Sequence, residues 1–258
     1  MESPGLSFAE HDRETIRAMA ASGAVLVLPI GAIEQHGPHL PVWTDTLVVE
    51  HLALGAAALV HDQLPILVAP TMPFGSSAHH LPFGGTLSLD TTVVLDVLKG
   101  LGRSAHRSGF RRLFILNGHG GNHELVELAA RDLSLELGID VAGASWWQVA
   151  ADQLAKTGAH DHGRVPGHAG AFETALISAL RPDLVRAMPP VRPGPHATDA
   201  HHRPAYRLER GGFWHGIDGY SDQPGALDAD LGRDVLERAT VALADALRDF
   251  HRTVEGHE

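Results

Sequence analysis

Three short segments of the sequence carry metal-ligating side chains just beyond expected helices or strands. The first follows the apolar run 24–30, which we expect to form a strand, and carries Glu34, His36 and Asp45. Because alternate residues of an extended segment point the same way, Glu34 and His36 are able to reach one site together. Carboxylate oxygen and imidazole nitrogen are ligands of first-row divalent metals. This segment therefore predicts a metal-dependent enzyme.

The other two segments supply further ligand types. His119 lies in NGHGGN, residues 117–122, directly after another apolar run, and Glu173 ends GHAGAFE at an expected loop-to-helix junction. Together the three segments offer enough ligands for two ions, and two-metal sites usually need a bridging carboxylate. Structural interpretations stay open: the NGHGGN glycines could form a turn with positive φ, and Glu173 could be a first-turn acid favoured by the helix dipole.

Composition limits the classes of function. The chain has 258 residues, 44% of them apolar, which favours one folded domain over residues 1–258 and argues against disorder. A formal net charge of −11 argues against nucleic-acid and anionic-membrane partners. The absence of cysteine excludes thiolate metal ligands and fits a cytoplasmic protein. We expect neither a signal peptide nor a membrane span.

Strand-like and helix-like patterns alternate along the chain, which favours an α/β fold with a mainly parallel sheet and helices on both faces. In such folds the loops beyond the carboxyl ends of the strands form the site. Strands are expected over residues 24–30, 66–70, 112–116 and 140–146. Helices are expected over residues 7–22 (with Ser7 as the cap), 46–60, 91–108, 123–137, 148–156, 171–180 and 228–254. Residues 71–89, 157–170 and 182–227 show little periodicity.

The motifs PIGAIEQHGPHLPVWTDT, NGHGGN and GHAGAFET, in that order, resemble the creatininase family, also called creatinine amidohydrolase-like proteins. GIDGYSDQPGALDADLGRDVLE near the C-terminus resembles the family's last shared block, so the resemblance runs from about residue 24 to 245. It implies a three-layer α/β/α fold and a homohexamer. It also implies two divalent ions per chain, with zinc expected first and manganese or iron as alternatives. The implied activity is hydrolysis of an amide, cyclic amide or formamide C–N bond in a small molecule.

Carried over motif by motif, the resemblance also implies roles for the ligand residues. Glu34 and His119 would hold one ion, and His36 and Glu173 would hold the other. Asp45 would bridge the two ions. The ions would activate a water molecule as the nucleophile.

His168, in the GHAG motif, is implied to be the general acid/base that protonates the leaving nitrogen. The chain departs from the true creatinine hydrolases, which carry tyrosine and glutamate in place of Gly120 and Gly121 and a tryptophan in place of Arg164. Glu173 is therefore the candidate to replace that glutamate as a ligand, and creatinine is not the expected substrate.

Four residues are candidate substrate contacts: Ser76, Gly120, Trp147 and Arg164. Arg164 could bind a carboxylate or phosphate with its guanidinium fork, or it could be a solvated loop residue. The family also places substrate contacts in the loop that carries Ser77, His79 and His80. Segment 196–207 could reach a neighbouring subunit.

The motifs do not separate the relatives that share NGHGGN. These include a formamide hydrolase of flavin and deazaflavin biosynthesis, a peptidase that trims the mycofactocin precursor, and a hydrolase that opens the ring of an oxidised inositol. A peptidase, a metal-assisted C–C ring hydrolase and a non-catalytic binding relative therefore stay as alternatives.

Overall fold

The centre of the fold is a parallel sheet whose strands follow the order β2-β1-β3-β4. The computed structural model describes residues 5–162, 164–187, 211–221, 223–226 and 228–255. The strands are β1 (Val25–Ile30), β2 (Ile66–Val68), β3 (Arg112–Asn117) and β4 (Asp140–Ser145). Each neighbouring pair is parallel, as the alternating pattern of strands and helices predicts.

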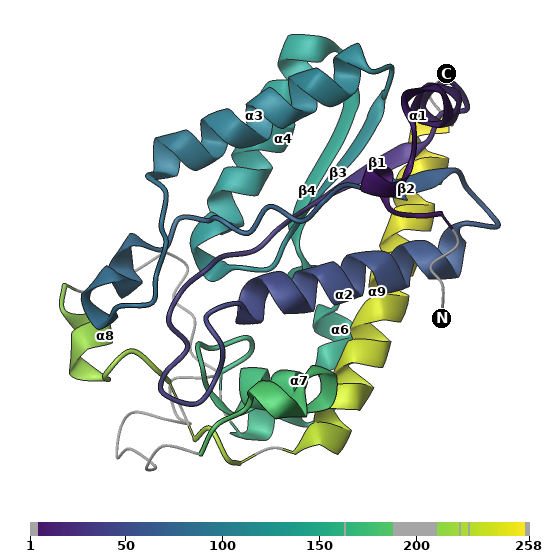
Figure 1. Ribbon diagram of the computed structural model, residues 1–258. Helices are drawn as coiled ribbons and strands as arrows, with labels where there is room; N and C mark the ends of the chain where they lie inside the picture. Colours follow the sequence, from purple (N-terminus) through teal and green to yellow (C-terminus); the bar gives the residue numbers. More distant parts are fainter. Residues whose placement is uncertain (1–4, 163, 188–210, 222, 227, 256–258) are drawn as a thin grey trace.

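Helices cover both faces of the sheet, and the side chains of β1 alternate between them. Val25 and Val27 join a core cluster with α2 (Thr44–Val60), α7 (Ala171–Leu180) and α9 (Ala229–Glu255). Leu26 and Leu28 join the opposite cluster with α1 (Arg13–Ala21), α3 (Thr91–Arg107) and α4 (His123–Leu137). Figure 1 shows α3 and α4 on one side of the sheet and α2 and α9 on the other. Burial on both faces explains the uninterrupted apolar strands and confirms the three-layer α/β/α prediction.

Short helical segments fill the connections. Three α-helical segments are α5 (Trp146–Val149), α6 (Ala151–Leu154) and α8 (Phe213–Gly216). The 3₁₀ segments are η1 (Phe8–Glu10), η2 (Ala78–Phe83), η3 (Gly120–Asn122), η4 (Ala159–His162) and η5 (Pro182–Leu184). Among the helices of the described ranges, none carries an apolar stretch long enough for a bilayer crossing.

The ends of the central strands lie side by side, and this register positions the ligand loops. Ile30 of β1 pairs with Asn117 of β3, which in turn pairs with Ser145 of β4. The chain therefore leaves β1 toward Glu34 and leaves β3 toward His119 at the same edge of the sheet. This edge is the one at which parallel α/β folds place their sites.

Two glycines let the first turn of α2 approach that edge closely. A Cβ added to Gly31 would lie 2.6 Å from the Cα of Thr46, and one added to Gly118 would lie 2.7 Å from the Cβ of Val49. Both contacts are shorter than packed carbon atoms allow. The missing side chains thus let α2 carry Asp45 to the ends of β1 and β3.

Several predicted boundaries are wrong for identifiable reasons. The helix predicted from residue 7 begins at Arg13, because Asp12 rather than Ser7 caps it, accepting from the N–H groups of Glu14 and Thr15 at 3.0 and 2.8 Å. β2 ends at Val68, before Pro70, which has no N–H to donate to a ladder.

The helix predicted over residues 148–156 is in fact two short helices, α5 and α6, that meet at Ala150. The first of them starts at Trp146, so the preceding strand ends one residue earlier than predicted. The side chains of Trp146 and Leu154 join the same core cluster, which holds both short helices against α9.

The close approach of α2 predicts the effect of Gly31→Ala. We expect this variant to lose about 1–3 kcal/mol of unfolding free energy, because the added methyl group meets backbone that cannot move aside easily. Urea denaturation measures the loss. Gly100→Ala in α3 is the matched control, since an added Cβ there meets nothing within 4 Å. Equal stability of the two variants would contradict this account of the packing.

Candidate metal centre

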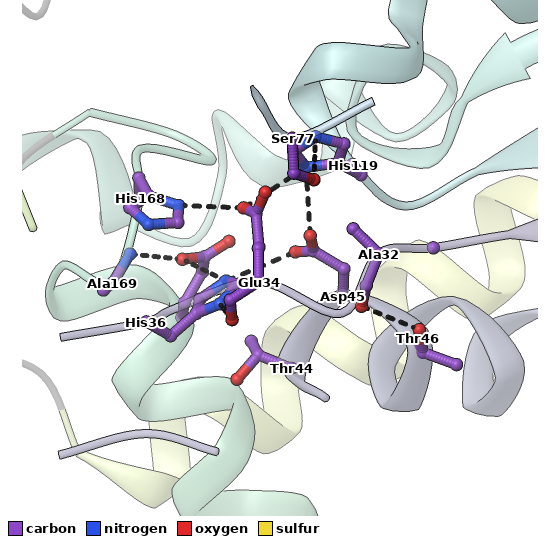
Figure 2. A network of polar contacts seen from close by, with 12 residues as sticks. Ala32, Glu34, His36, Thr44, Asp45, Thr46, Ser77, His119, His168 and Ala169 are labelled. Carbon is purple, nitrogen blue, oxygen red and sulfur yellow. Dashed lines mark hydrogen bonds and ion pairs between the residues drawn. The ribbon is translucent and has the colours of Figure 1, made fainter. Parts of the chain in front are cut away.

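Asp45 lies in the first turn of α2, with an imidazole facing each of its carboxylate oxygens. Its Oδ1 is 3.4 Å from Nε2 of His36, and its Oδ2 is 3.0 Å from Nδ1 of His119 (Figure 2). The two imidazoles come from the loops after β1 and β3. One carboxylate shared between two histidines has the arrangement of a bridging metal ligand.

Two further carboxylates complete the cluster. Oε1 of Glu34 lies 3.3 Å from Nδ1 of His119, and Oε2 of Glu173 lies 3.5 Å from Nε2 of His36. The structure therefore brings together all five residues predicted as ligands, in the two pairs expected on either side of Asp45. Glu173 is in the first turn of α7, where the helix dipole alone would favour an acidic residue. Its carboxylate nevertheless points to His36 and accepts a hydrogen bond from the N–H of Ala169.

Both ligand histidines direct their second nitrogen to a backbone carbonyl. Nδ1 of His36 lies 3.1 Å from the carbonyl oxygen of Glu34, and Nε2 of His119 lies 3.1 Å from that of Ser76. A carbonyl only accepts, so these nitrogens carry the hydrogen in the neutral rings. The nitrogens that face Asp45 are then free to bind a metal ion, an arrangement typical of histidine metal ligands.

Oε2 of Glu34 is buried and lacks a hydrogen-bond partner within the described residues. Leaving such groups unpaired is costly in a protein interior. Three sets of residues each offer ligand atoms that lie within 4.8 Å of one another inside the set. They are Glu34 with His79 and His119; Glu34 with His36 and His168; and His36 with Asp45 and Glu173. The oxygen and imidazole donors fit a first-row divalent ion.

The electrostatics of the cluster favour bound cations. Burial raises the pKa of the Glu34 carboxyl. Burial also opposes ionisation of Asp45, but the imidazoles of His36 and His119 lower the pKa of its carboxyl below the usual value. Burial opposes protonation of these two imidazoles, yet the neighbouring carboxylates raise both pKa values well above the usual 6.5. In the metal-free protein, protons on the two rings thus supply positive charge.

His168 is placed to exchange a proton at the edge of the cluster. Its Nε2 lies 2.9 Å from the carbonyl oxygen of Gln35, and its Nδ1 lies 3.3 Å from Oε1 of Glu34. The Gln35 carbonyl only accepts and so favours the tautomer with hydrogen on Nε2, although the side-chain nitrogen of Gln35 also lies 3.0 Å from that atom; Nδ1 faces the cluster. Burial and the nearby imidazole of His36 lower the pKa of His168 well below 6.5. The ring is therefore neutral and able to accept a proton at Nδ1.

The two asparagines of NGHGGN hold the ligand loops. Nδ2 of Asn117 donates to the carbonyl of His119 at 2.7 Å, and its Oδ1 accepts from the N–H of His119 at 2.9 Å. Nδ2 of Asn122 donates to the carbonyl of Gly31, while its Oδ1 accepts from the N–H of Ser76. These contacts fix three loops relative to one another.

The interpretation that the NGHGGN glycines need positive φ is wrong. None of the three glycines of this motif, Gly118, Gly120 and Gly121, has a positive φ angle. Gly118 allows α2 to approach, and a Cβ on Gly121 would collide with the carbonyl of Ser76. Close contact between protein segments, rather than turn geometry, requires these two glycines.

The remaining candidate residues lie in different surroundings. Ser76 is half-buried beside His119, and Gly120 is exposed, with nothing within 4 Å of an added Cβ. Trp147 is half-buried, packs on the core and contacts Trp146 edge-on, and Arg164 is exposed. Segment 196–207 lies outside the described residues. The roles of these residues in binding substrate stay predictions.

Sequence reasoning missed Gln35, which lies beside His168 and His80. Nε2 of Gln35 donates to the carbonyl of Gly219 at 2.6 Å and lies 2.9 Å from Nδ1 of His80. The His80 ring stacks on His168 with centroids 4.0 Å apart, and burial, with His79 nearby, lowers the pKa of His80 to about 2. Gln35 alternates with Glu34 and His36, so an extended backbone alone would point its side chain away from theirs.

The comparisons with known proteins identify the family to which the chain belongs. The sequence matches the creatininase family, described as creatinine amidohydrolase, over residues 9–247, and the chain belongs to this family. A crystal structure of creatinine amidohydrolase has a TM-score of 0.76 and 27% identity, covering 96% of this chain and 98% of that one. Similar structures include a mutant creatininase of zinc–zinc type and a manganese form of creatininase.

Two curated relatives are similar over about two thirds of the chain. The mycofactocin precursor peptide peptidase of Mycobacterium tuberculosis (strain ATCC 25618 / H37Rv) is 36% identical over 181 residues, 67% of this chain. The chain spans only 64% of that peptidase's length. The creatinine amidohydrolase of Pseudomonas putida is 34% identical over 184 residues, 65% of this chain and 68% of that protein.

The raised pKa values of His36 and His119 predict that metal binding releases protons. Each ion displaces the proton of its imidazole, so zinc affinity should fall as pH falls, by about tenfold per pH unit for each proton displaced. Calorimetry in buffers of different ionisation enthalpy measures the release. An affinity that stays constant between about pH 8 and about pH 6 would contradict the assignment of these histidines as ligands.

Proposed function

We propose that this protein is a binuclear metal-dependent amidohydrolase that hydrolyses an amide, cyclic amide or formamide C–N bond of a small molecule. One observation carries the proposal: the Asp45 carboxylate faces His36 with one oxygen and His119 with the other. Both histidines offer that carboxylate the nitrogen that is free of a backbone partner. Membership of the creatininase family supports the same class of reaction.

Two divalent ions are proposed for the cluster, with zinc expected first and manganese or iron as alternatives. Glu34 and His119 would hold one ion, His36 and Glu173 the other, and both would share Asp45. Bound ions of this kind polarise a carbonyl group and activate water near neutral pH. The zinc–zinc and manganese forms among similar structures support these metals.

His168 is the proposed general base and acid. Its Nδ1 takes a proton as water attacks the carbonyl carbon and then delivers that proton to the leaving nitrogen. The backbone carbonyl of Gln35 holds the opposite nitrogen and thereby prevents the ring from turning. Glu34, 3.3 Å from Nδ1, stabilises the imidazolium that forms between the two transfers.

A second candidate substrate is a peptide. The 36% identity to the Mycobacterium tuberculosis peptidase favours it, and hydrolysis of a peptide bond would use the same proposed residues. Assembly into a hexamer also stays a proposal carried by family membership.

Replacement of Asp45 tests the shared carboxylate. The untagged wild-type protein should bind about two ions per chain, and Asp45→Asn about one or fewer, because the amide removes the charge that both ions share. Plasma mass spectrometry measures metal content, and release of amine or ammonia from a panel of amides measures activity. Asp96→Asn, at an exposed aspartate in α3, should match wild type in both. A fully active Asp45→Asn protein would exclude the proposed centre.

Replacement of His168 separates proton transfer from metal binding. We expect His168→Gln to keep about two ions per chain and to lose about 10²- to 10⁴-fold in kcat, the usual contribution of a general acid/base. Unchanged turnover would remove His168 from the mechanism. A metal-loaded wild type that released no amine from any amide or peptide would instead favour the non-catalytic or C–C-cleaving alternatives.

A further inference from the structure

An aromatic side chain from a distant part of the chain lies against the imidazoles at the candidate centre. Trp214 is in the short helix α8. Its ring centroid is 4.6 Å from that of His80 and 5.1 Å from that of His168, both edge-on, and 5.5 Å from that of His79. The sequence around Trp214 has no periodicity, so no pattern pointed to this position.

Two sets of hydrogen bonds connect the segment that carries Trp214 to the candidate catalytic residues. Gln35 donates to the carbonyl of Gly219. The N–H of Ser221 donates to the carbonyl of His168 at 2.8 Å, and the N–H of His168 donates to Oγ of Ser221 at 3.0 Å. The contacts that position His168 therefore also position the segment that follows Trp214.

Trp214 lies near the part of the cluster that is exposed to solvent. His119 is buried, whereas Gly120 beside it is exposed and borders open space. The exposed ring of His79 stacks over His119, with centroids 6.1 Å apart and an interplanar angle of 9°, and it also contacts Trp214. Trp214 itself is half-buried, so part of its indole is accessible.

These rings offer flat π surfaces close to the proposed reacting atoms. The rings of His80 and His168 stack on each other, with centroids 4.0 Å apart and an interplanar angle of 16°, and Trp214 meets both edge-on. Aromatic rings prefer other rings in edge-on or offset contacts and gain more from them than from alkyl groups of similar area. A wall of this kind selects for a planar substituent on the substrate.

On the basis of the proposed function, we propose that Trp214 is a specificity-determining residue. Its indole contacts a planar substituent of the substrate beside the scissile C–N bond, next to His168. The favoured substrate class is then small amides that carry an aromatic or conjugated ring next to that bond. In this arrangement Trp214 contacts substrate and takes no part in proton transfer, which belongs to His168.

Two metal-chelating probes test this inference. Benzohydroxamate and acetohydroxamate bind metal through the same group and differ in a phenyl or a methyl substituent. Calorimetry measures both dissociation constants on the zinc-loaded protein, for wild type, Trp214→Leu and Trp214→Phe. We expect Trp214→Leu to weaken benzohydroxamate about tenfold and acetohydroxamate less than about twofold, because leucine keeps bulk but no π surface. Trp214→Phe should keep most of the preference.

Other results would overturn the inference. If Trp214→Leu kept the preference for benzohydroxamate over acetohydroxamate, or weakened both probes equally, Trp214 would only pack against His80 and His168 and would not determine specificity. Loss of the phenyl preference in Trp147→Ala instead would assign the aromatic wall to Trp147. If neither probe bound zinc-loaded wild type, no ligand would reach the metal beside Trp214, and the inference would be overturned while the metal content still supported the proposed centre.

Discussion

The structure depends on how it balances the charge of three carboxylates that the fold buries together. Glu34, Asp45 and Glu173 are all at most 8% exposed, and their ion-pair partners in the described residues are imidazoles. Burying carboxylates without a permanent positive charge is expensive. Protonated histidines can offset this cost, but divalent cations do so more fully, which supports the proposal that the cluster binds metal ions.

The fold gathers these charges by backbone geometry more than by side-chain reach. Parallel pairing places the ends of β1 and β3 side by side, and Gly31 and Gly118 let α2 approach both. Asp45 is thereby carried between the two loops. The backbone carbonyl of Glu34 then turns His36 so that its free nitrogen faces the carboxylate. The positions of the proposed ligands thus depend on the backbone of β1, β3 and α2 and on the two loops that follow the strands.

Much of the site could be predicted from the sequence, because the apolar runs of β1 and β3 end directly before ligand-bearing segments. Local patterns do not encode contacts between distant segments. Gln35 reaches Gly219, 184 positions away, and Trp214 meets His80 through a segment with no helical or strand period. The start of α1 was missed for a local reason, since Asp12 competed with Ser7 as a cap and only the folded backbone shows which accepts.

The most direct test of the shared carboxylate is anomalous X-ray diffraction from zinc-containing crystals, measured on both sides of the zinc absorption edge. The account predicts two anomalous peaks per chain, one touching Oδ1 of Asp45 and Nε2 of His36, the other touching Oδ2 of Asp45 and Nδ1 of His119. A single peak per chain, or two peaks of which either leaves Asp45 untouched, would contradict the binuclear centre.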